Sequence, residues 1–384
     1  MLRSIEAKLY PTPAQVETLD NWLQTCCRVY NQALEQRIKA YKRRKESVSL
    51  YDQFGMLTEW RERISTVDAV PAQFARDALR RLDKGFKAFF RRLKSGQKPG
   101  FPRFRAKDRY TTLECLVSGS YIRPGNLLRI PKLGLVSFRA GNQQIPGTQK
   151  LLRIIKRASG WFAQVLVDDG QPVPPKVPVQ TSIGVDVGLT TFAALSTGEK
   201  ISNPRFARKS QRKVRSASRN LSRKQKRSKN RRKALIKLQR AHEKIKAQRK
   251  SFAHQHSRDL VNRFDLIAVE KLNIAGLARG KLSKSILDAA WGMFLFQLTY
   301  KAECAGRQVI QVNPRGTSQT CPNCGAIKKK NLSERVHECP CGLTCDRDQA
   351  AARVILLRAL GVAGVLPAEG VTNTVGTVPA ASRP

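Results

Sequence analysis

Four cysteines near the carboxyl end constrain this chain more than any other feature. They form two close pairs, Cys321-Pro-Asn-Cys324 and Cys339-Pro-Cys341, with 14 residues between them. Two short loops that each carry two thiolates can close a tetrahedral Zn²⁺ site at little cost in chain entropy, because zinc prefers four soft ligands. We therefore expect a zinc-binding insertion over residues 321–345, followed at once by a helix that begins near Asp348.

The net charge predicts a polyanionic partner. The 384 residues include 72 Lys and Arg against 28 Asp and Glu, a formal charge of +44. Such an excess repels itself unless a polyanion neutralises it, and nucleic acid is the natural candidate. Five of the nine cysteines lie between 321 and 345, which favours metal binding in a reducing compartment over disulfides. With neither an apolar run of about 18 residues nor a signal peptide, we expect a soluble cytoplasmic protein without a membrane partner.

The amino-terminal part, residues 1–170, is predicted to contain helices and then strands. A short strand over 1–10 precedes a helix over 14–44, and a second helix covers 71–92. The period then becomes strand-like, which indicates a small antiparallel barrel or sandwich with strands at 127–130, 135–138, 151–155 and 161–167. The proline-rich residues 171–180 are typical of a stiff linker.

The second predicted helix offers a polar face with Gln73, Arg76 and Arg80. Gln and Arg side chains can read base edges in a major groove, although a basic face can also do no more than neutralise phosphate. Behind this helix, Phe101-Pro-Arg-Phe104-Arg105 interleaves aromatic rings with arginines, a composition that suits either stacking on nucleotides or loop packing.

A second basic region covers residues 205–250, which we expect to form one long helix with Glu243 as its only acid. Like charges at four-residue spacing cost about 0.2 to 0.5 kcal/mol per pair. The pattern therefore favours a nucleic-acid-binding helix over a merely solvated one. Its candidate contacts are Arg223, Arg227, Arg231 and Arg232.

Three acids lie where buried strands or a helix begin or end. Asp186 stands inside the apolar run 181–195, Glu270 ends a second apolar strand, and Asp348 starts the last helix. A buried carboxylate is costly unless it binds a cation or is fully hydrogen-bonded. Three carboxylates at neighbouring element ends can hold two Mg²⁺ (or Mn²⁺) ions about 3.5 to 4 Å apart, an arrangement that hydrolyses phosphodiesters.

Several strings resemble the TnpB (OrfB) proteins of insertion sequences, relatives of the CRISPR type V effector nucleases. In the second half they are Gly184-Val-Asp186-Val-Gly188, Val269-Glu270-Lys271-Leu-Asn273, Tyr300-Lys-Ala, Thr317-Ser-Gln-Thr-Cys321-Pro-Asn-Cys324-Gly and Asp346-Arg-Asp348. Those in the first half are Leu9-Tyr10-Pro11-Thr-Pro13, Val29-Tyr30-Asn31 and Phe101-Pro-Arg-Phe. The likeness therefore extends through most of the chain.

The resemblance implies an RNA-guided DNA endonuclease of a transposable element, with a guide RNA and a target DNA as partners. It implies a multidomain α+β protein in which N-terminal helices and a small β-barrel precede a split RuvC-like (RNase H-type) α/β nuclease domain with an inserted zinc ribbon. Asp186, Glu270 and Asp348 match the family's catalytic, Mg²⁺-binding positions. The implied parts are 1–170 for nucleic-acid recognition, 181–320 with 346–360 as nuclease and 321–345 as zinc insertion. Composition itself indicates the linker at 171–180 and a disordered tail at 361–384, which lacks periodicity.

Two departures from the family pattern leave alternatives open. Many relatives have two residues between the last two cysteines where this chain has one, so Cys345 or His337 could replace Cys339 or Cys341 as a zinc ligand. The family usually has Asn two positions after the last catalytic acid, where this chain has Ala350. That change motivates a second hypothesis, an RNA-guided DNA-binding regulator without nuclease activity. A zinc-ribbon RNA-binding protein is a third, but it leaves the buried acids unexplained.

Overall fold

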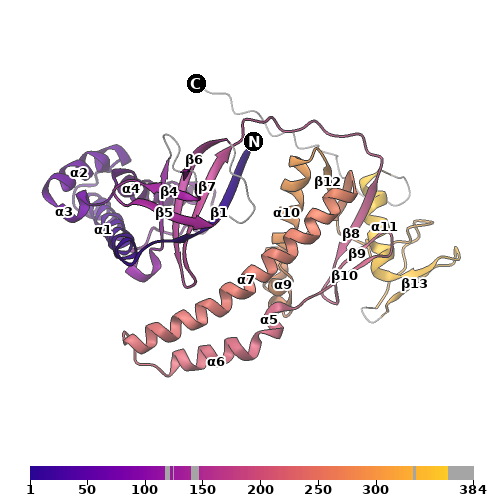
Figure 1. The fold of residues 1–384 in the computed structure, drawn as a ribbon. Coiled ribbons are helices and arrows are strands. Elements are labelled where there is room, and N and C mark those ends of the chain that lie inside the picture. Colours follow the sequence, from indigo (N-terminus) through magenta and orange to yellow (C-terminus); the bar gives the residue numbers. More distant parts are fainter. Residues whose placement is uncertain (117–121, 124, 140–146, 332–333, 362–384) are drawn as a thin grey trace. The chain divides into compact units, whose positions relative to one another are not determined.

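The chain divides into two compact units, which we describe separately. The computed structural model describes residues 1–116, 122–123, 125–139, 147–331 and 334–361 (Figure 1). The first unit comprises residues 1–172 and the second begins at residue 173. All but one residue of the tail expected at 361–384 lies outside the described part.

The helices of the first unit follow from clear local signals. Thr12 and Gln15 form a capping box at the start of the first long helix, with Pro13 in its first turn, a position that suits proline's fixed φ. The helices expected at 14–44 and 71–92 are confirmed, and a further one, α2, was not anticipated. Their bounds are α1 Pro13–Arg44, α2 Leu50–Arg63, α3 Ser65–Asp68 and α4 Ala72–Lys94, with a short 3₁₀ turn at Lys107–Arg109.

The strands of the first unit form one antiparallel sheet in the order β2-β6-β7-β1-β5-β4-β3. The four strands expected between residues 127 and 167 are confirmed. In the described residues β2 and β3 each pair with a single neighbour, and residues 117–121 between them lie outside the described part. The seven strands thus form one sheet, and its closure into the expected barrel stays a prediction. Helices α1 and α4 contact β2, and the core lies between helices and sheet. The bounds are β1 Leu2–Tyr10, β2 Thr112–Leu116, β3 Ile122–Arg123, β4 Leu127–Ile130, β5 Gly134–Arg139, β6 Thr148–Arg157 and β7 Gly160–Asp168.

Asp77 is a buried carboxylate of α4 that makes the stability of the protein depend on pH. Its side chain pairs with Arg81, whose Nε lies 2.5 Å from Asp77 Oδ2, and Asp77 is only 4 % exposed. Burial raises the pKa of Asp77 to about 6, although the Arg81 charge opposes the shift. An acid with a raised folded-state pKa binds more protons when folded, so stability falls as the pH rises from about 4 to about 6.

Asp77→Asn should therefore stabilise the protein at pH 7 by about 2 to 3 kcal/mol. The gain should shrink to a small fraction near pH 4, where the native carboxyl is protonated in the folded state and about half protonated in the unfolded state. Thermal unfolding of the full chain at both pH values, with the exposed Asp108→Asn as a control, measures the difference. A gain of equal size at pH 4 and pH 7 would contradict the prediction.

The second unit is built on a five-stranded sheet in the order β10-β9-β8-β11-β12. Strands β8, β11 and β12 run parallel, while β9 and β10 are antiparallel additions at one edge. On β11, Ile267 and Val269 join the core with helices α7 and α10, whereas Leu266 and Ala268 join the core with helix α11. Helices therefore cover both faces of the sheet (Figure 1). The bounds are β8 Ser182–Val187, β9 Thr191–Leu195, β10 Lys200–Ser202, β11 Leu266–Glu270, β12 Gln308–Val312, α10 Trp291–Cys304 and α11 Arg347–Ala359.

The basic region is a helical hairpin, so the expectation of one helix over 205–250 is wrong. Helices α5 (Phe206–Lys209) and α6 (Gln211–Ser222) precede a turn, and α7 (Lys229–Arg263) returns along α6 (Figure 1). Arg227 adopts a left-handed conformation with φ of 69°, and the Ser228 hydroxyl accepts from the Arg231 backbone N–H to start α7. The turn and the serine cap thus divide the basic region into separate helices.

The cysteine insertion contains a small two-stranded sheet, β13 (Val336–Glu338) with β14 (Thr344–Asp346). Strand β14 runs directly into α11. The remaining short helices of the unit are α8 (Ile274–Leu277) and α9 (Ser283–Ala289). Among the helices that the structure describes, none is long and apolar enough to cross a membrane.

Candidate active site and metal centre

Two of the three acids lie side by side because of strand register. In the parallel pair β8–β11, Val185 stands opposite Val269, so Asp186 and Glu270 occupy the next positions on neighbouring strands. Side chains alternate between the two faces of a sheet. Since Val185 and Val269 both pack with α7 and α10, the two acids face the side covered by α11. Both are half-buried.

The third acid, Asp348, lies on helix α11. Asp346 caps this helix by accepting the backbone N–H groups of Asp348 and Gln349 at 3.0 and 3.2 Å, which places Asp348 in the first turn. The helix crosses β8 at very close range: a Cβ on Gly184 would lie 1.9 Å from the Ala352 carbonyl oxygen. Only glycine allows this approach, which holds the start of α11 beside the strand.

Glu270 and Asp348 both lie near enough to Asp186 for their charges to act on it, although in the described residues the three carboxylates do not form a group as close as that of the four cysteines. The pKa of Asp186 is raised well above its usual range, first by burial and then by the charges of Glu270 and Asp348, while Arg347 opposes the shift. Burial also raises the pKa of Glu270, against the opposing effects of Thr317 and Arg358. Mutually repelling carboxylates in a partly buried site are the donor set that suits a hard divalent cation.

Glu270 is held in place from the side of the cysteine insertion. The buried Thr317 hydroxyl donates to Glu270 Oε1 at 2.5 Å. Nearby, Arg358 Nη1 donates to the carbonyl oxygens of Asn313 and Arg315, both at 2.9 Å, and so fixes the turn that leads to Thr317. Sequence reasoning missed Thr317, although it stands in the Thr-Ser-Gln-Thr string before Cys321.

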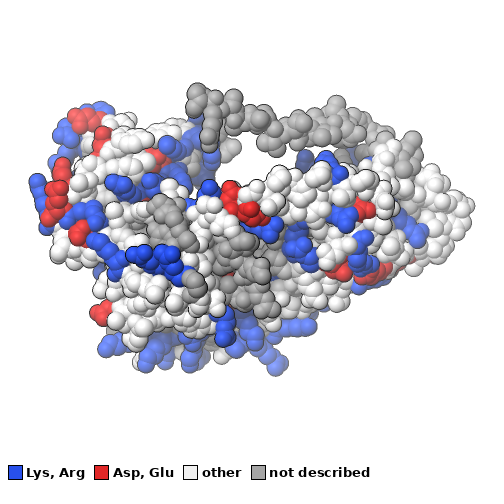
Figure 2. All heavy atoms as spheres, turned by 45° about the horizontal axis from the view of Figure 1, so that its top comes forward, with Lys and Arg blue, Asp and Glu red and all other residues white. Residues whose placement is uncertain are grey.

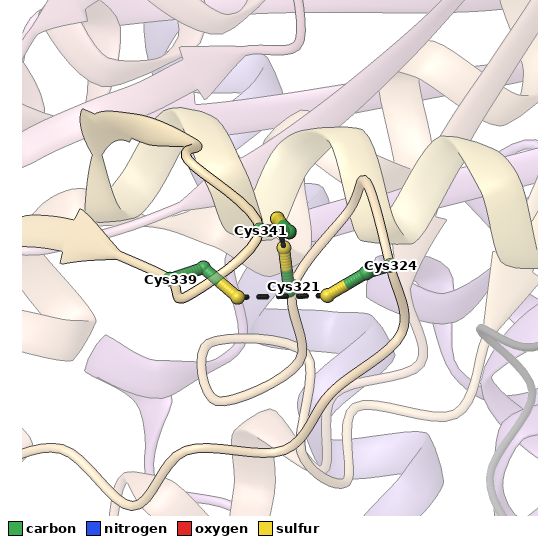
Figure 3. Close-up of side chains that lie close together, drawn as sticks. All are labelled: Cys321, Cys324, Cys339 and Cys341. Carbon is green, nitrogen blue, oxygen red and sulfur yellow. Dashed lines mark hydrogen bonds between the residues drawn. The ribbon is translucent and has the colours of Figure 1, made fainter.

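The four expected cysteines come together. Their sulfur atoms all lie within 4.8 Å of one another (Figure 3), with 3.7 Å between Cys321 and Cys341 and 3.5 Å between Cys324 and Cys339. A tetrahedral site with Zn–S bonds of about 2.3 Å has sulfurs about 3.8 Å apart. The donor set therefore fits a zinc ion.

The alternative ligands lie elsewhere in the insertion. His337 and Cys345 are opposite each other in the β13–β14 ladder and do not belong to the four-sulfur group. His337 is buried, and its Nδ1 contacts the Lys330 amine. The single residue between Cys339 and Cys341 is thus compatible with both acting as ligands.

The insertion is joined to the acidic site at both of its ends. Thr317, which bonds Glu270, lies four residues before Cys321, and Asp346, which caps the helix of Asp348, follows Cys345 directly. A metal that fixed the cysteines would therefore also fix the two segments that position two of the three acids.

The predicted nucleic-acid contacts fall on two surfaces. Gln73, Arg76 and Arg80 lie along one side of α4, where the Arg76 and Arg80 guanidinium groups sit over the Phe54 ring at 5.8 and 5.7 Å from its centre. At the hairpin turn, three of the predicted arginines are exposed, whereas Arg231 is half-buried and donates to the carbonyl oxygens of Leu221 and Lys224. Figure 2 shows that Lys and Arg outnumber the acids over the face in view.

Family models match three parts of the chain. A model for the OrfB_IS605 family, described as "Probable transposase", matches residues 164–280. A helix-turn-helix model of the same family matches residues 1–46, which here comprise β1 and α1. A Cas12f1-like TNB domain model matches residues 291–355, which include the four cysteines and Asp348.

Relatives cover nearly the whole chain. A Streptomyces pristinaespiralis protein named "Putative RNA-guided DNA endonuclease" is 32 % identical over 380 residues, covering 96 % of this chain and 92 % of its own. The Escherichia coli K12 protein named "Putative RNA-guided DNA endonuclease InsQ" is 27 % identical over 375 residues, covering 92 % of each chain. Among solved structures, the mini-RNA-guided endonuclease CRISPR-Cas phi3 aligns with a TM-score of 0.49 and 11 % identity, over 97 % of this chain and 94 % of that one.

Proposed function

The chain belongs to the TnpB (OrfB) family, and we propose that it is an RNA-guided DNA endonuclease of a transposable element. The observation that carries the proposal is the convergence of Asp186, Glu270 and Asp348 from β8, β11 and α11. The second unit would then be a RuvC-like, RNase H-type nuclease domain, a reading that the mixed five-stranded sheet with helices on both faces supports.

The three acids would hold divalent cations, Mg²⁺ or Mn²⁺. When bound, such ions would supply an activated water and stabilise the leaving oxygen of a phosphodiester. The chain's own groups prepare the site: Gly184 lets α11 approach the sheet, Asp346 caps that helix, and Thr317 orients Glu270. The cysteine group would hold a structural zinc that keeps Asp346 and Thr317 in place.

Nucleic acid would be held by the basic surfaces. A guide RNA would supply sequence specificity by pairing with the target DNA, while the protein reads backbone shape and a short motif beside the target. The α6–α7 hairpin, with exposed arginines at 223, 227 and 232, is suited to lie along phosphates. Gln73, Arg76 and Arg80 on α4 are the candidates for reading the short motif.

The direct test is to purify the protein with its bound RNA, sequence that RNA and supply a matching DNA with Mg²⁺. We expect cuts in the matching DNA and none when the metal is chelated. Failure with every guide and adjacent motif tested would refute the nuclease.

A second candidate function rests on Ala350, which is 1 % exposed where the family usually carries Asn. Without a polar side chain at this position, the neighbouring acids lack one group that could position a carboxylate or a water. In that case the protein would bind DNA under RNA guidance without cutting it. Tight guide-dependent binding with no cleavage at any metal concentration would favour this function over the first.

Thr317→Val should weaken the metal site through loss of the hydrogen bond to Glu270. Residues that hold a metal ligand in place typically contribute 10- to 100-fold in metal affinity or activity. We expect the Mg²⁺ concentration for half-maximal cleavage to rise about tenfold, whereas Thr317→Ser, which keeps the hydroxyl, should stay close to the native value. An equal loss in both variants would instead indicate a packing role for the threonine methyl group.

A further inference from the structure

The end of helix α4 carries a group of aromatic rings that the proposed cleavage chemistry does not use. Phe86, Phe89, Phe90 and Phe101 form this group: the Phe89 ring lies 5.2 Å from Phe90 and 5.3 Å from Phe101, and the Phe86 ring lies 5.5 Å from Phe101, centre to centre. Phe86 is buried beneath, but Phe90 is 57 % and Phe101 is 47 % exposed. Contiguous exposed aromatic surface of this kind commonly marks a binding site.

The backbone around this group is fixed in two places. Pro102 packs on the bare backbone of Gly85, where an added Cβ would lie 3.6 Å from Pro102 Cγ. Three residues after Pro102, the backbone of Arg105 is held by the Asn31 side chain, which accepts from the Arg105 N–H at 2.8 Å and donates to the Arg105 carbonyl oxygen at 2.9 Å. The exposed rings are therefore held in position before any ligand binds, which lowers the entropy cost of binding.

The sequence that carries these rings is strongly basic, and Asp83, which lies just before it, is paired with Arg37 and Lys87. From Lys84 to Lys107, both included, the sequence contains nine Lys and Arg and no Asp or Glu. Arg91 and Arg92 lie in the last turn of α4, next to Phe90, and Arg103 follows Phe101 by two residues. An apolar protein surface would gain nothing from these cations, whereas a polynucleotide offers both phosphates and flat bases.

Unpaired nucleotides match this surface better than a duplex. Bases within a duplex are already stacked on one another, so their faces cannot reach a protein ring. RNA-binding proteins recognise single-stranded loops and ends by stacking the splayed bases on aromatic side chains and arginine planes. An RNA that stays bound to the protein would keep such a segment on the rings continuously.

We propose that Phe90 and Phe101 form a stacking platform for unpaired bases of the bound RNA, with Arg91, Arg92 and Arg103 holding the flanking phosphates. The inference rests on the proposed function in so far as the protein is taken to carry an RNA. It adds a defined contact with single-stranded RNA in the first unit, separate from the metal site.

The test compares the full-length protein, stripped of RNA at high salt, with its Phe90→Ala/Phe101→Ala variant. The probe is a fluorescent 12-nucleotide uridine RNA. We expect the variant to bind this RNA at least tenfold more weakly, because each lost base stack typically costs that order of affinity. The salt dependence of binding should not change, since no phosphate contact is lost. Phe90→Trp/Phe101→Trp should bind at least as well as the native protein.

Matched controls separate stacking from loss of charge or fold. Phe296→Ala removes an exposed ring from α10 in the second unit and should leave RNA binding unchanged. Arg91→Ala/Arg103→Ala should reduce the salt slope by about 1.4, since each phosphate contact with a single strand contributes about 0.7. Circular dichroism of all variants checks that the helices persist.

Native-like binding by the Phe90→Ala/Phe101→Ala variant would overturn the platform. An equal loss on duplex RNA would point to misfolding and overturn it as well. A clearly larger loss on a matched thymidine DNA than on the RNA would replace RNA by single-stranded DNA as the occupant. Because the readout is binding, a native protein that binds the RNA but never cleaves DNA would refute only the nuclease, and the platform would stand.

Discussion

Asp186→Asn is expected to abolish DNA cleavage while leaving the bound RNA and the affinity for target DNA unchanged. The substitution removes one charge from the three acids that we propose hold the metal, without changing the shape of the side chain. Loss of such charge stabilisation costs several kcal/mol in the transition state. At about 1.4 kcal/mol per factor of ten, the cleavage rate should fall about a thousandfold or more.

The same substitution should make the metal-free protein more stable. The pKa of Asp186 is raised by burial and by the charges of Glu270 and Asp348, so the ionised carboxyl destabilises the fold at pH values above its unfolded-state pKa. Asparagine carries no charge at any pH, and the melting temperature in EDTA should therefore rise at pH 7. Such a gain in stability with a loss of activity is typical of residues kept for function.

The control for both measurements is Glu303→Gln, which removes a carboxylate from an exposed position on α10. It should change neither cleavage nor melting temperature. Cleavage undiminished in Asp186→Asn would place the chemistry elsewhere. Loss of cleavage together with a lower melting temperature would give Asp186 a structural role.

The position of the two strand acids could be predicted because their signals are local. Asp186 and Glu270 each follow a run of apolar residues that favours a buried strand, and strands of parallel sheets typically have such runs. The four candidate zinc ligands could be predicted equally well, since two short cysteine loops fix their own geometry.

Other features depend on contacts that sequence periodicity does not encode. Gly184 looks like any small strand residue until α11 crosses it at 1.9 Å from the position of a Cβ. The Thr317–Glu270 bond joins residues 47 positions apart. In the first unit, β1 inserts between β5 and β7, a pairing of the chain's start with strands more than a hundred residues later. Local strand signals gave the strands of this sheet but not this order.

Cys321→Ser is expected to remove the zinc ion and, with it, the order of the acidic site. Structural zinc contributes about 10 to 16 kcal/mol of apparent binding energy in small zinc domains, and losing one of four thiolates removes most of it. Elemental analysis should find about one zinc per native chain and close to none in the variant. The insertion between residues 321 and 345 should become sensitive to protease, while the first unit should stay resistant.

Cys345→Ser is the matched control, because Cys345 lies in the same insertion but outside the four-sulfur group. It should retain one zinc and native resistance to protease. If Cys345→Ser lost the metal and Cys341→Ser kept it, Cys345 would be the fourth ligand and the assignment of Cys341 would be wrong.

Cleavage should fail in Cys321→Ser although all three acids remain. Without the metal, each end of the insertion loses one of its anchors, so Thr317 should hold Glu270 less firmly and Asp346 should fix the first turn of α11 less firmly. The zinc would thus act on cleavage only by positioning Glu270 and Asp348. We therefore expect that high Mg²⁺ partly restores cleavage in Cys321→Ser but not in Asp186→Asn. Full cleavage by a zinc-free protein would show that the acids are held without the insertion.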